Sequence, residues 1–344
     1  MMNKVDYIIV GDGYAAMFFA HQLIVNNKSF ALFSEGKKNA SQISAGIINP
    51  VVLKKFTTFW LAKEQIDFLK KTLTEIEIYT GKNYLIEEDI HRIFHDENEK
   101  KLWQERCETS DLLPFLNKDF EFLQTIKNDF GTGIVNHSAR LDVHNFFEDI
   151  LSYLERNNFL IREKFDYTEI KENTYKNILY KNIVFCEGMA VKENPFFYDI
   201  PLIPNKGHHL KVKLSTEIPN QYTLKKKHFL FPLDKETHYY GGTYDPIERT
   251  NEIDDFAQQQ LVDGLSEFYP HDFKLEEINF GFRPTVKDRR PILGSHQEHH
   301  NFYLFNGLGA RGILNGCYFS KELFEYIENG KPLLPEVNLK RFSV

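Results

Sequence analysis

Residues 7–16 read YIIVGDGYAA, an apolar run that ends in the pattern Gly-x-Gly-x-x-Ala. This order predicts a β-strand, a tight glycine turn and the first turn of a helix. At such a turn, free backbone N–H groups and the helix dipole both favour a bound diphosphate. The first glycine permits the turn, the second lets the backbone approach the phosphate, and an alanine replaces the third glycine. The stretch predicts a dinucleotide site made by Gly11, Gly13, Tyr14, Ala15 and Ala16.

A second buried strand is predicted at residues 30–33, after a helix that ends near Asn26. Glu35 follows this strand, 24 residues after Gly11. An acid at about this spacing hydrogen-bonds a ribose hydroxyl in β-α-β dinucleotide sites. Its charge would repel a 2′-phosphate, so we expect FAD or NAD rather than NADP. The alternative is an ordinary αβ crossover with Glu35 on the surface.

The overall composition excludes several classes of protein. The 344 residues are 42% hydrophobic and 26% charged, with no apolar run of about 18 residues that would predict a membrane span. The first strand is expected to start near Val5, which leaves no room for a signal peptide, so we expect a cytoplasmic protein. The net charge of -7 argues against a nucleic-acid partner, because phosphate binding needs clustered Lys and Arg.

Two local features have a structural interpretation. Cys107, Cys186 and Cys317 are widely separated, so they indicate neither a disulfide framework nor a metal site, and we expect buried core residues. Residues 225–227, all lysine, form the only compact basic run. We interpret this run as a solvated turn between strands rather than a phosphate-binding patch.

Further segments predict the rest of a ligand site. Residues 40–50, ASQISAGIINP, carry small side chains that let the backbone lie against a flat ring system. A buried strand at residues 182–186 precedes Gly188, and such strand ends bind ligands in open α/β sheets. Residues 201–245 are strand-rich with turn signals, which predicts an antiparallel sheet that forms the wall of a substrate pocket.

The last 64 residues contain closely spaced glycines and prolines. The segments are GFRPT at 281–285, DRRPILG at 288–294 and FYLFNGLGARG at 302–312. A helix is predicted at residues 313–328, between Gly312 and Gly330. The N-terminus of this helix would direct a positive dipole at whatever lies before it.

Taken in order, these segments resemble the D-amino-acid oxidase family of FAD-dependent oxidoreductases, and within it the glycine oxidase-like subgroup. The resemblance rests on the first glycine turn, Ala-Gly-Ile-x-Asn-Pro at 45–50, a Lys-Gly turn at 206–207, Gly-x-Arg-Pro-x-x-x-Asp-x-x-Pro-x-x-Gly at 281–294, and the turn into the C-terminal helix. It implies an α/β fold. A Rossmann-like FAD-binding domain (1–50, 131–200 and 276–344) is expected with an interleaved α+β substrate domain (51–130 and 201–275) built on the antiparallel sheet.

The resemblance also implies which residues bind FAD. Gly11, Gly13 and Glu35 would hold the ADP half, while Ser44, Ala45 and Gly46 would lie along the isoalloxazine ring. The pyrimidine end of that ring and the adjoining strand end would be surrounded by Gly188, Gly309, Ala310, Arg311, Gly312 and Ile313. No His or Cys directly precedes Ala45, so noncovalent FAD is expected.

The same resemblance makes Arg283 the clamp for a substrate carboxylate, a role that a guanidinium suits because it binds carboxylates bidentately and stays charged. The alternative is a buried salt-bridge arginine beside the flavin. Two departures from the family put the substrate in doubt: Phe229 replaces a tyrosine of the pocket wall, and Ala310 replaces a second arginine. Weaker pocket candidates, each with a plain structural alternative, are His208, His209, Tyr240 and Tyr244.

These observations favour an enzyme that oxidises the C–N bond of an amino acid or secondary amine by hydride transfer to flavin, with water hydrolysing the resulting imine. Oxygen or a quinone would accept the electrons. One alternative is an oxidase for a carboxymethylaminomethyl-modified tRNA uridine, ranked lower because the sequence has no methyltransferase half and is acidic. Others are a non-catalytic flavin-binding module and an NAD dehydrogenase.

Overall fold

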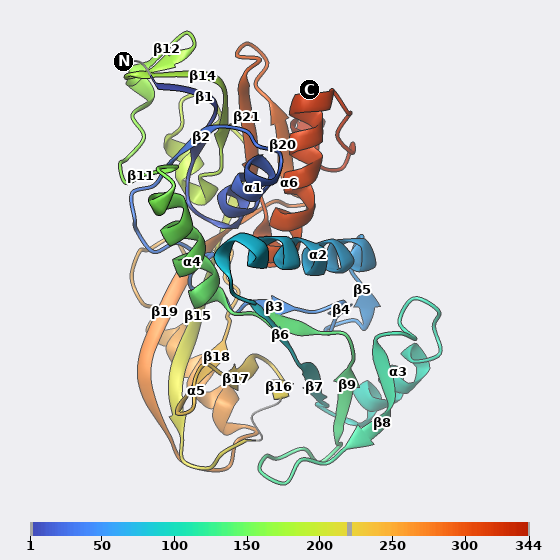
Figure 1. Cartoon of the computed structure of the whole chain (residues 1–344). Helices are drawn as coiled ribbons and strands as arrows, with labels where there is room; N and C mark the ends of the chain where they lie inside the picture. Colours follow the sequence, from blue (N-terminus) through green and yellow to red (C-terminus); the bar gives the residue numbers. More distant parts are fainter. Residues whose placement is uncertain (1–2, 219–221, 343–344) are drawn as a thin grey trace.

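The computed structural model describes residues 3–218 and 222–342. Two eight-stranded sheets occupy opposite halves of the molecule, and helix α2 (Ala62–Thr80) lies across the region between them (Figure 1). Residues 3 and 342, where the described chain begins and ends, lie in the half that contains the first sheet (Figure 1). The mixed α/β class predicted from the sequence is confirmed.

The first sheet has a parallel centre. Strand β1 (Asn3–Val10) pairs in parallel with β2 (Phe30–Phe33) and with β14 (Ile178–Phe185), and β14 pairs in parallel with β21 (Phe302–Asn306). Residues 7–10 and 30–33 are buried throughout, as expected for a parallel sheet covered on both faces. Its outer strands are β11 (Leu160–Ile161), β12 (Ile170–Lys171), β13 (Thr174–Tyr175) and β20 (Ile292–Ser295).

Helices α1 (Tyr14–Val25) and α6 (Gly312–Asn329) pack on one another beside this sheet (Figure 1). Ten of the twelve α1 residues are buried, because the sheet, α6 and helix α4 (Val143–Arg156) surround it. The shared core includes Phe18, Phe146 and Cys317. The three cysteines are free and buried, as expected.

The second sheet forms the other half of the molecule. Its strand order is β19 (Phe273–Thr285), β15 (Ile203–Leu214), β18 (Thr237–Gly241), β17 (Phe229–Pro232), β16 (Tyr222–Lys225), β7 (Asp89–Ile93), β9 (Thr132–Val135) and β8 (Leu116–Glu121). All neighbours are antiparallel except β16 and β7, which are parallel. Helix α5 (Asp255–Ser266) packs on one face, against Leu210, Leu224, Leu230 and Tyr240.

Smaller elements complete the chain. A three-stranded sheet contains β3 (Ile47–Ile48), β10 (Ala139–Leu141) and β6 (Leu85–Glu87), and β4 (Val51–Val52) pairs with β5 (Thr57–Thr58). Helix α3 (Glu97–Arg106) contacts β8. Four 3-10 turns span Tyr167–Glu169, Gly188–Glu193, Gly309–Arg311 and Leu339–Phe342.

Two sequence expectations need correction. Lys206 and Gly207 do not form a turn: they lie inside β15, opposite Phe282 and Gly281 of β19, because that ladder runs through them. The pairing of two strands also differs from the expected segments. Thr132–Val135 lies within the expected FAD-binding segment 131–200, and Phe273–Thr285 crosses the border between 275 and 276, but both strands pair within the second sheet.

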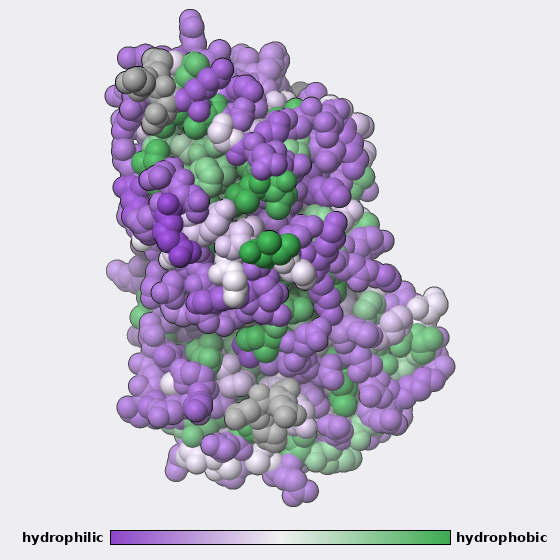
Figure 2. All heavy atoms as spheres, viewed as in Figure 1, coloured by the Kyte–Doolittle hydropathy of each residue, from purple (hydrophilic) through white to green (hydrophobic). Residues whose placement is uncertain are grey.

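The surface of the view in Figure 2 is largely hydrophilic, with apolar residues scattered in small groups. Among the helices formed by residues 3–218 and 222–342, none is long and apolar enough to cross a membrane.

Candidate active site

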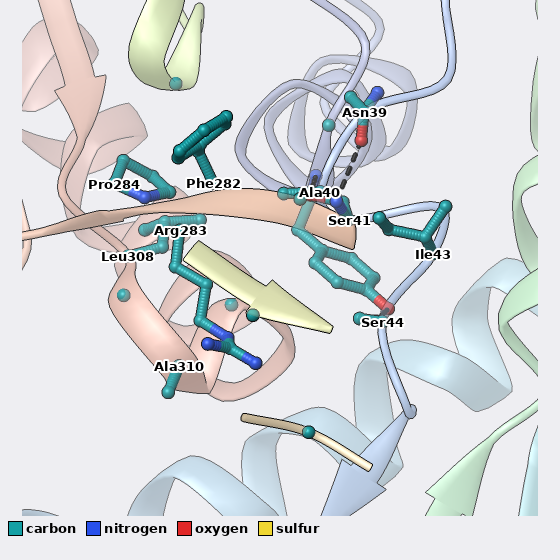
Figure 3. A pocket seen from close by; sticks show the side chains of 18 of the residues that line it. Asn39, Ala40, Ser41, Ile43, Ser44, Phe282, Arg283, Pro284, Leu308 and Ala310 are labelled. Atoms are coloured by element: carbon teal, nitrogen blue, oxygen red, sulfur yellow. Dashed lines mark hydrogen bonds between the residues drawn. The ribbon is translucent and has the colours of Figure 1, made fainter. Parts of the chain in front are cut away.

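A cavity of about 760 Å³ lies between the two sheets. Its wall brings together segments that are far apart in the chain: 11–15, 38–47, 186–190, 207–209, 242–244, 279–284 and 305–314. Figure 3 shows side chains from several of these segments around one space. Of the twenty residues that the sequence offered as site candidates, seventeen line the cavity and three, Ala16, Glu35 and Tyr240, do not.

The glycine turn forms one end of the cavity. Gly11 has a φ of +114°, and a Cβ on it would lie 2.5 Å from the Cys186 carbonyl oxygen. The backbone of β1 therefore approaches that of β14 so closely that only glycine fits. Helix α1 begins at Tyr14 directly behind Gly13, which has no side chain to cap it, and the Tyr14 N–H donates to Ser41 Oγ at 3.2 Å. A helix N-terminus beside an open glycine turn fits a diphosphate.

Glu35 lies outside the cavity wall and forms an ion pair with Lys37, so its ribose contact stays a prediction. The carboxylates that do line the cavity, within the described ranges, are Asp12 and Glu187. Asp12 accepts hydrogen bonds from Ser34 Oγ at 2.5 Å and Asn39 Nδ2 at 2.8 Å. Sequence reasoning missed both acids, although Glu187 follows a strand that it had identified.

Glu187 is a buried carboxyl group. Burial raises its pKa to about 7, although hydrogen bonds donated by Asn194 Nδ2 at 2.7 Å and by the Tyr167 hydroxyl act in the opposite direction. Because its pKa in the folded state exceeds the usual value, the folded protein should lose stability as pH rises from about 4.3 toward 7.

We expect Glu187→Gln to abolish this loss. The variant should melt at a higher temperature than the wild type at pH 8, with little difference at pH 5, because glutamine stays neutral at both pH values. Thermal unfolding of the FAD-free proteins at the two pH values measures this. Equal melting temperatures of the wild type and Glu187→Gln at pH 8 would show that ionisation of Glu187 does not destabilise the folded protein.

The small-residue segment lies where a flat ring could contact it. Ser44, Ala45 and Gly46 line the cavity, and the Ser44 hydroxyl oxygen is 2.8 Å from that of Tyr14. The Asn39 carboxamide oxygen accepts a hydrogen bond from the Ser41 N–H at 2.9 Å, which shapes the loop before them (Figure 3). The contact between Ser44 and Tyr14 holds this segment against α1.

The turn before α6 closes the cavity from the other side. Residues 309–313 line it, and the N-terminus of α6 has no side-chain cap, so its free N–H groups and positive dipole favour negative charge there. The Arg311 guanidinium lies 4.6 Å from the centroid of the Phe59 ring. Burial and then the nearby Arg289 and Arg290 lower the pKa of Arg311.

Arg283 extends from β19 into the cavity (Figure 3). Its Nη1 donates to Asn205 Oδ1 at 3.1 Å and to the Thr243 carbonyl at 3.0 Å. Across residues 3–218 and 222–342, no carboxylate forms an ion pair with Arg283. The buried salt bridge considered as an alternative is therefore not formed by this part of the chain, and the cation faces the cavity without an acidic partner.

Gly207 provides the space for this guanidinium. A Cβ on Gly207 would overlap with Nη1, Nη2 and Cζ of Arg283, and one on Gly242 would lie 2.9 Å from Nη2. The Gly207→Ala variant should therefore displace the guanidinium. We expect kcat/KM to fall at least about tenfold, a loss of about 1.4 kcal/mol in transition-state binding, while the FAD content stays unchanged.

Steady-state kinetics of Gly207→Ala with Gly264→Ala as a control checks this. Gly264 lies in α5, on the face of the sheet that points away from the cavity. A wild-type kcat/KM in Gly207→Ala would show that the guanidinium position does not matter for the reaction.

The four histidine and tyrosine candidates, His208, His209, Tyr240 and Tyr244, differ in their surroundings and in whether they reach the cavity. His208 Nε2 accepts a hydrogen bond from the Asp254 N–H at 3.2 Å, so this nitrogen is already engaged. His209 stacks on Tyr239, and burial followed by the Arg283 charge lowers its pKa to about 4. Tyr244 is exposed and lines the cavity, whereas Tyr240 is buried in the core under α5.

Sequence reasoning missed Tyr239 and Lys225, both of which line the cavity. The basic run was interpreted wrongly in part: Lys227 is exposed and Lys226 pairs with Glu267 at 2.9 Å, but Lys225 ends β16 and faces the cavity. The period-two alternation of β16 and β17 could have indicated this, since Leu224 and Leu230 occupy the opposite, core-facing side.

The chain belongs to the family of FAD-dependent oxidoreductases, because the model of the family described as "DAO: FAD dependent oxidoreductase" matches residues 6–326. The resemblance to the D-amino-acid oxidase family is thus confirmed. The glycine turn, the α1 N-terminus and the small-residue segment fit FAD in the cavity.

Solved structures share this fold. Glycine oxidase from Geobacillus kaustophilus superposes with a TM-score of 0.80 at 15% identity, covering 96% of each chain. Iminodiacetate oxidase from Chelativorans sp. BNC1 superposes with a TM-score of 0.75 at 16% identity, covering 98% of each chain. These likenesses show a shared fold, which in this chain consists of one part built on the sheet with a parallel centre and a second part built on the mostly antiparallel sheet.

A curated relative is the tRNA 5-methylaminomethyl-2-thiouridine biosynthesis bifunctional protein MnmC of Campylobacter jejuni subsp. doylei, 24% identical over 300 residues. The match covers 83% of this chain and 45% of the relative. The chain therefore spans about half the length of this relative.

Proposed function

We propose that the protein oxidises the C–N bond of a small amine that carries a carboxylate, with noncovalently bound FAD. The observation that carries the proposal is Arg283, a guanidinium with no acidic partner in the described chain, in the same cavity as a seat for a dinucleotide. A cation held in place by Asn205 and Thr243 is prepared for a carboxylate, to which it can donate bidentately.

Each part of the wall has a task in this reaction. Gly11 and the N-terminus of α1 bind the diphosphate, and residues 44–46 support the ring. FAD, when bound, supplies a hydride acceptor. Arg283 orients the substrate by its carboxylate, so that a C–H bond next to nitrogen can be placed toward the ring. The N-terminus of α6 favours the negative charge that reduction brings.

Product analysis tests the proposal. FAD-loaded protein is incubated with glycine, sarcosine, proline or D-amino acids, with oxygen or a quinone as acceptor. The expected result is a carbonyl product, because the imine that forms by loss of a hydride and a proton is hydrolysed by water. Ammonia or an amine is released from the acyclic substrates, whereas the cyclic imine from proline opens to an amino-keto acid. Flavin-bound protein that forms no carbonyl product from any of these amines would contradict the proposal.

A second candidate substrate is a carboxymethylaminomethyl group on a tRNA uridine. It is favoured by the curated relative, whose name places it in the biosynthesis of a modified tRNA uridine. Arg290 lies 4.2 Å from the centroid of the Trp60 ring and Arg311 lies beside Phe59, and such pairs of cation and aromatic ring suit nucleotides. Turnover of the modified uridine within tRNA, without turnover of free amino acids, would favour this candidate.

A further inference from the structure

Lys225 is a further cation in the cavity wall, on the same sheet as Arg283. It is the last residue of β16, opposite Phe229 of β17, and Phe229 is opposite Gly241 of β18. Gly241 in turn lies opposite His209 of β15. Directly opposed residues of neighbouring strands point to the same face of a sheet, so Lys225 shares the cavity face with His209.

The surroundings of Lys225 leave its charge without an acidic partner. Its Nζ lies 4.3 Å from the centroid of the Phe229 ring and donates to the Lys227 carbonyl at 2.7 Å. Within the described ranges, no carboxylate forms an ion pair with it. Burial, and to a lesser extent Arg92, lower the pKa of Lys225 to about 7. An anion at this end of the cavity would stabilise the ammonium form.

Arg283 lies on the same face, because it is four residues from Asn279, which is opposite His209. The backbones of β19 and β16 are four strand spacings apart, about 19 Å. The Arg283 group lies over Gly207 of β15 and the Lys225 group lies over Phe229 of β17. Gly207 and Phe229 are two strand spacings apart across the sheet, about 10 Å, and two residues apart along it, about 7 Å, so about 12 Å separates the two cationic groups.

The wall between the two cations is aromatic and neutral. Tyr239 stacks on His209 at 4.5 Å and on Phe231 at 4.7 Å between ring centroids. The two carboxylates that line the cavity in the described chain, Asp12 and Glu187, lie at the end of the first sheet. The substrate half of the cavity therefore has a cation at each end and no described carboxylate to neutralise either.

We infer that Lys225 binds a second anionic group, a carboxylate or a phosphate, at the end of the substrate away from the carboxylate held by Arg283. This inference rests on the proposed function, since it takes Arg283 as the first anchor. It narrows the substrate class to amines that carry two anionic groups about 5 Å or more apart, because both charges must be reached at once.

Ligand binding to FAD-loaded protein tests this without turnover. The probes are butyrate, glutarate and 4-phosphonobutyrate, which share a chain length but differ at the far end, and binding is read from the change in the flavin absorption spectrum. The wild type should bind glutarate or 4-phosphonobutyrate at least about tenfold more tightly than butyrate. The anion with the larger gain identifies the group that Lys225 takes.

Substitutions test whether Lys225 causes the preference for dianionic probes over butyrate. Lys225→Met should bring the ratio of dianion affinity to butyrate affinity close to one, while its affinity for butyrate stays within about twofold of the wild-type value. Lys225→Arg should keep part of the preference for the dianions. Lys227→Met, an exposed residue of the same turn, is the matched control and should behave as wild type.

Two results would overturn the inference alone: a wild type that binds butyrate as tightly as both dianions, or a Lys225→Met variant that keeps the full preference. If none of the three probes binds to the FAD-loaded wild type, the Arg283 anchor is wrong as well. The binding data therefore distinguish an error in the role of Lys225, where the probes bind without the expected preference, from an error in the proposed function, where none of the probes binds.

Discussion

Replacing Arg283 by alanine is expected to lower kcat/KM by about 100-fold to 1,000-fold while FAD stays bound. Two charge-assisted hydrogen bonds to a substrate carboxylate are worth about 3–4 kcal/mol, and each 1.4 kcal/mol corresponds to a factor of ten. The side chain touches Asn205 and Thr243 rather than the glycine turn, so loss of the guanidinium should leave the dinucleotide end intact. Steady-state kinetics and the FAD-to-protein ratio measure both effects.

Arg283→Lys is the matched variant. It keeps a positive charge but loses the planar fork, so it should recover only part of the lost kcat/KM. If Arg283→Ala keeps both kcat and KM at wild-type values, Arg283 does not hold the substrate.

Replacing Gly11 by alanine should give a second large effect, the loss of FAD binding. The φ of +114° is rarely adopted by residues with a side chain, and the Cβ would lie 2.5 Å from the Cys186 carbonyl oxygen. β1 and β14 must move apart to relieve this contact, which displaces the turn that receives the diphosphate. We expect FAD affinity to fall at least about 100-fold, which is about 2.7 kcal/mol.

Two further variants separate this effect from general damage. Gly13→Ala should weaken FAD binding less, because its Cβ would lie 3.0 Å from Ser41 Oγ, a side-chain atom that can move. Gly81→Ala, also at positive φ but with no atom within 4 Å of its Cβ, should lose about 1 kcal/mol of stability and keep FAD. Stoichiometric FAD in a folded Gly11→Ala protein would contradict the diphosphate assignment.

Local patterns were sufficient to predict three central strands of the first sheet, β1, β2 and β14. The strand at residues 7–10, the turn at Gly11 and the helix after it depend on neighbours in sequence, and the structure agrees with them. The same is true of the helix that ends at Gly330, whose φ of +66° makes it a C-cap. Such signals are local, so a sequence carries them directly.

The features that the sequence did not predict depend on contacts with residues far away in the chain. Lys206 and Gly207 resemble a turn in isolation, but β19, more than 70 residues later, pairs with them and extends the strand. The environment of Arg283 depends on Asn205 and Thr243, which sequence spacing does not relate to it. Lys225 faces the cavity because it is paired with Phe229 in the sheet. In the sequence it is the first of three consecutive lysines, so it was assigned to a solvated turn together with the other two.

Anaerobic reduction of the flavin is the decisive test of amine oxidation by this protein. FAD-loaded protein is mixed without oxygen with glycine, sarcosine, proline, D-amino acids and iminodiacetate, and the flavin absorption band is followed. At least one of these carboxylate-bearing amines should bleach the band, and the flavin of Arg283→Ala should bleach at least about 100-fold more slowly at low substrate concentration. A flavin that dithionite reduces, but that none of these amines reduces, would contradict amine oxidation and would indicate a flavin-binding protein without amine turnover.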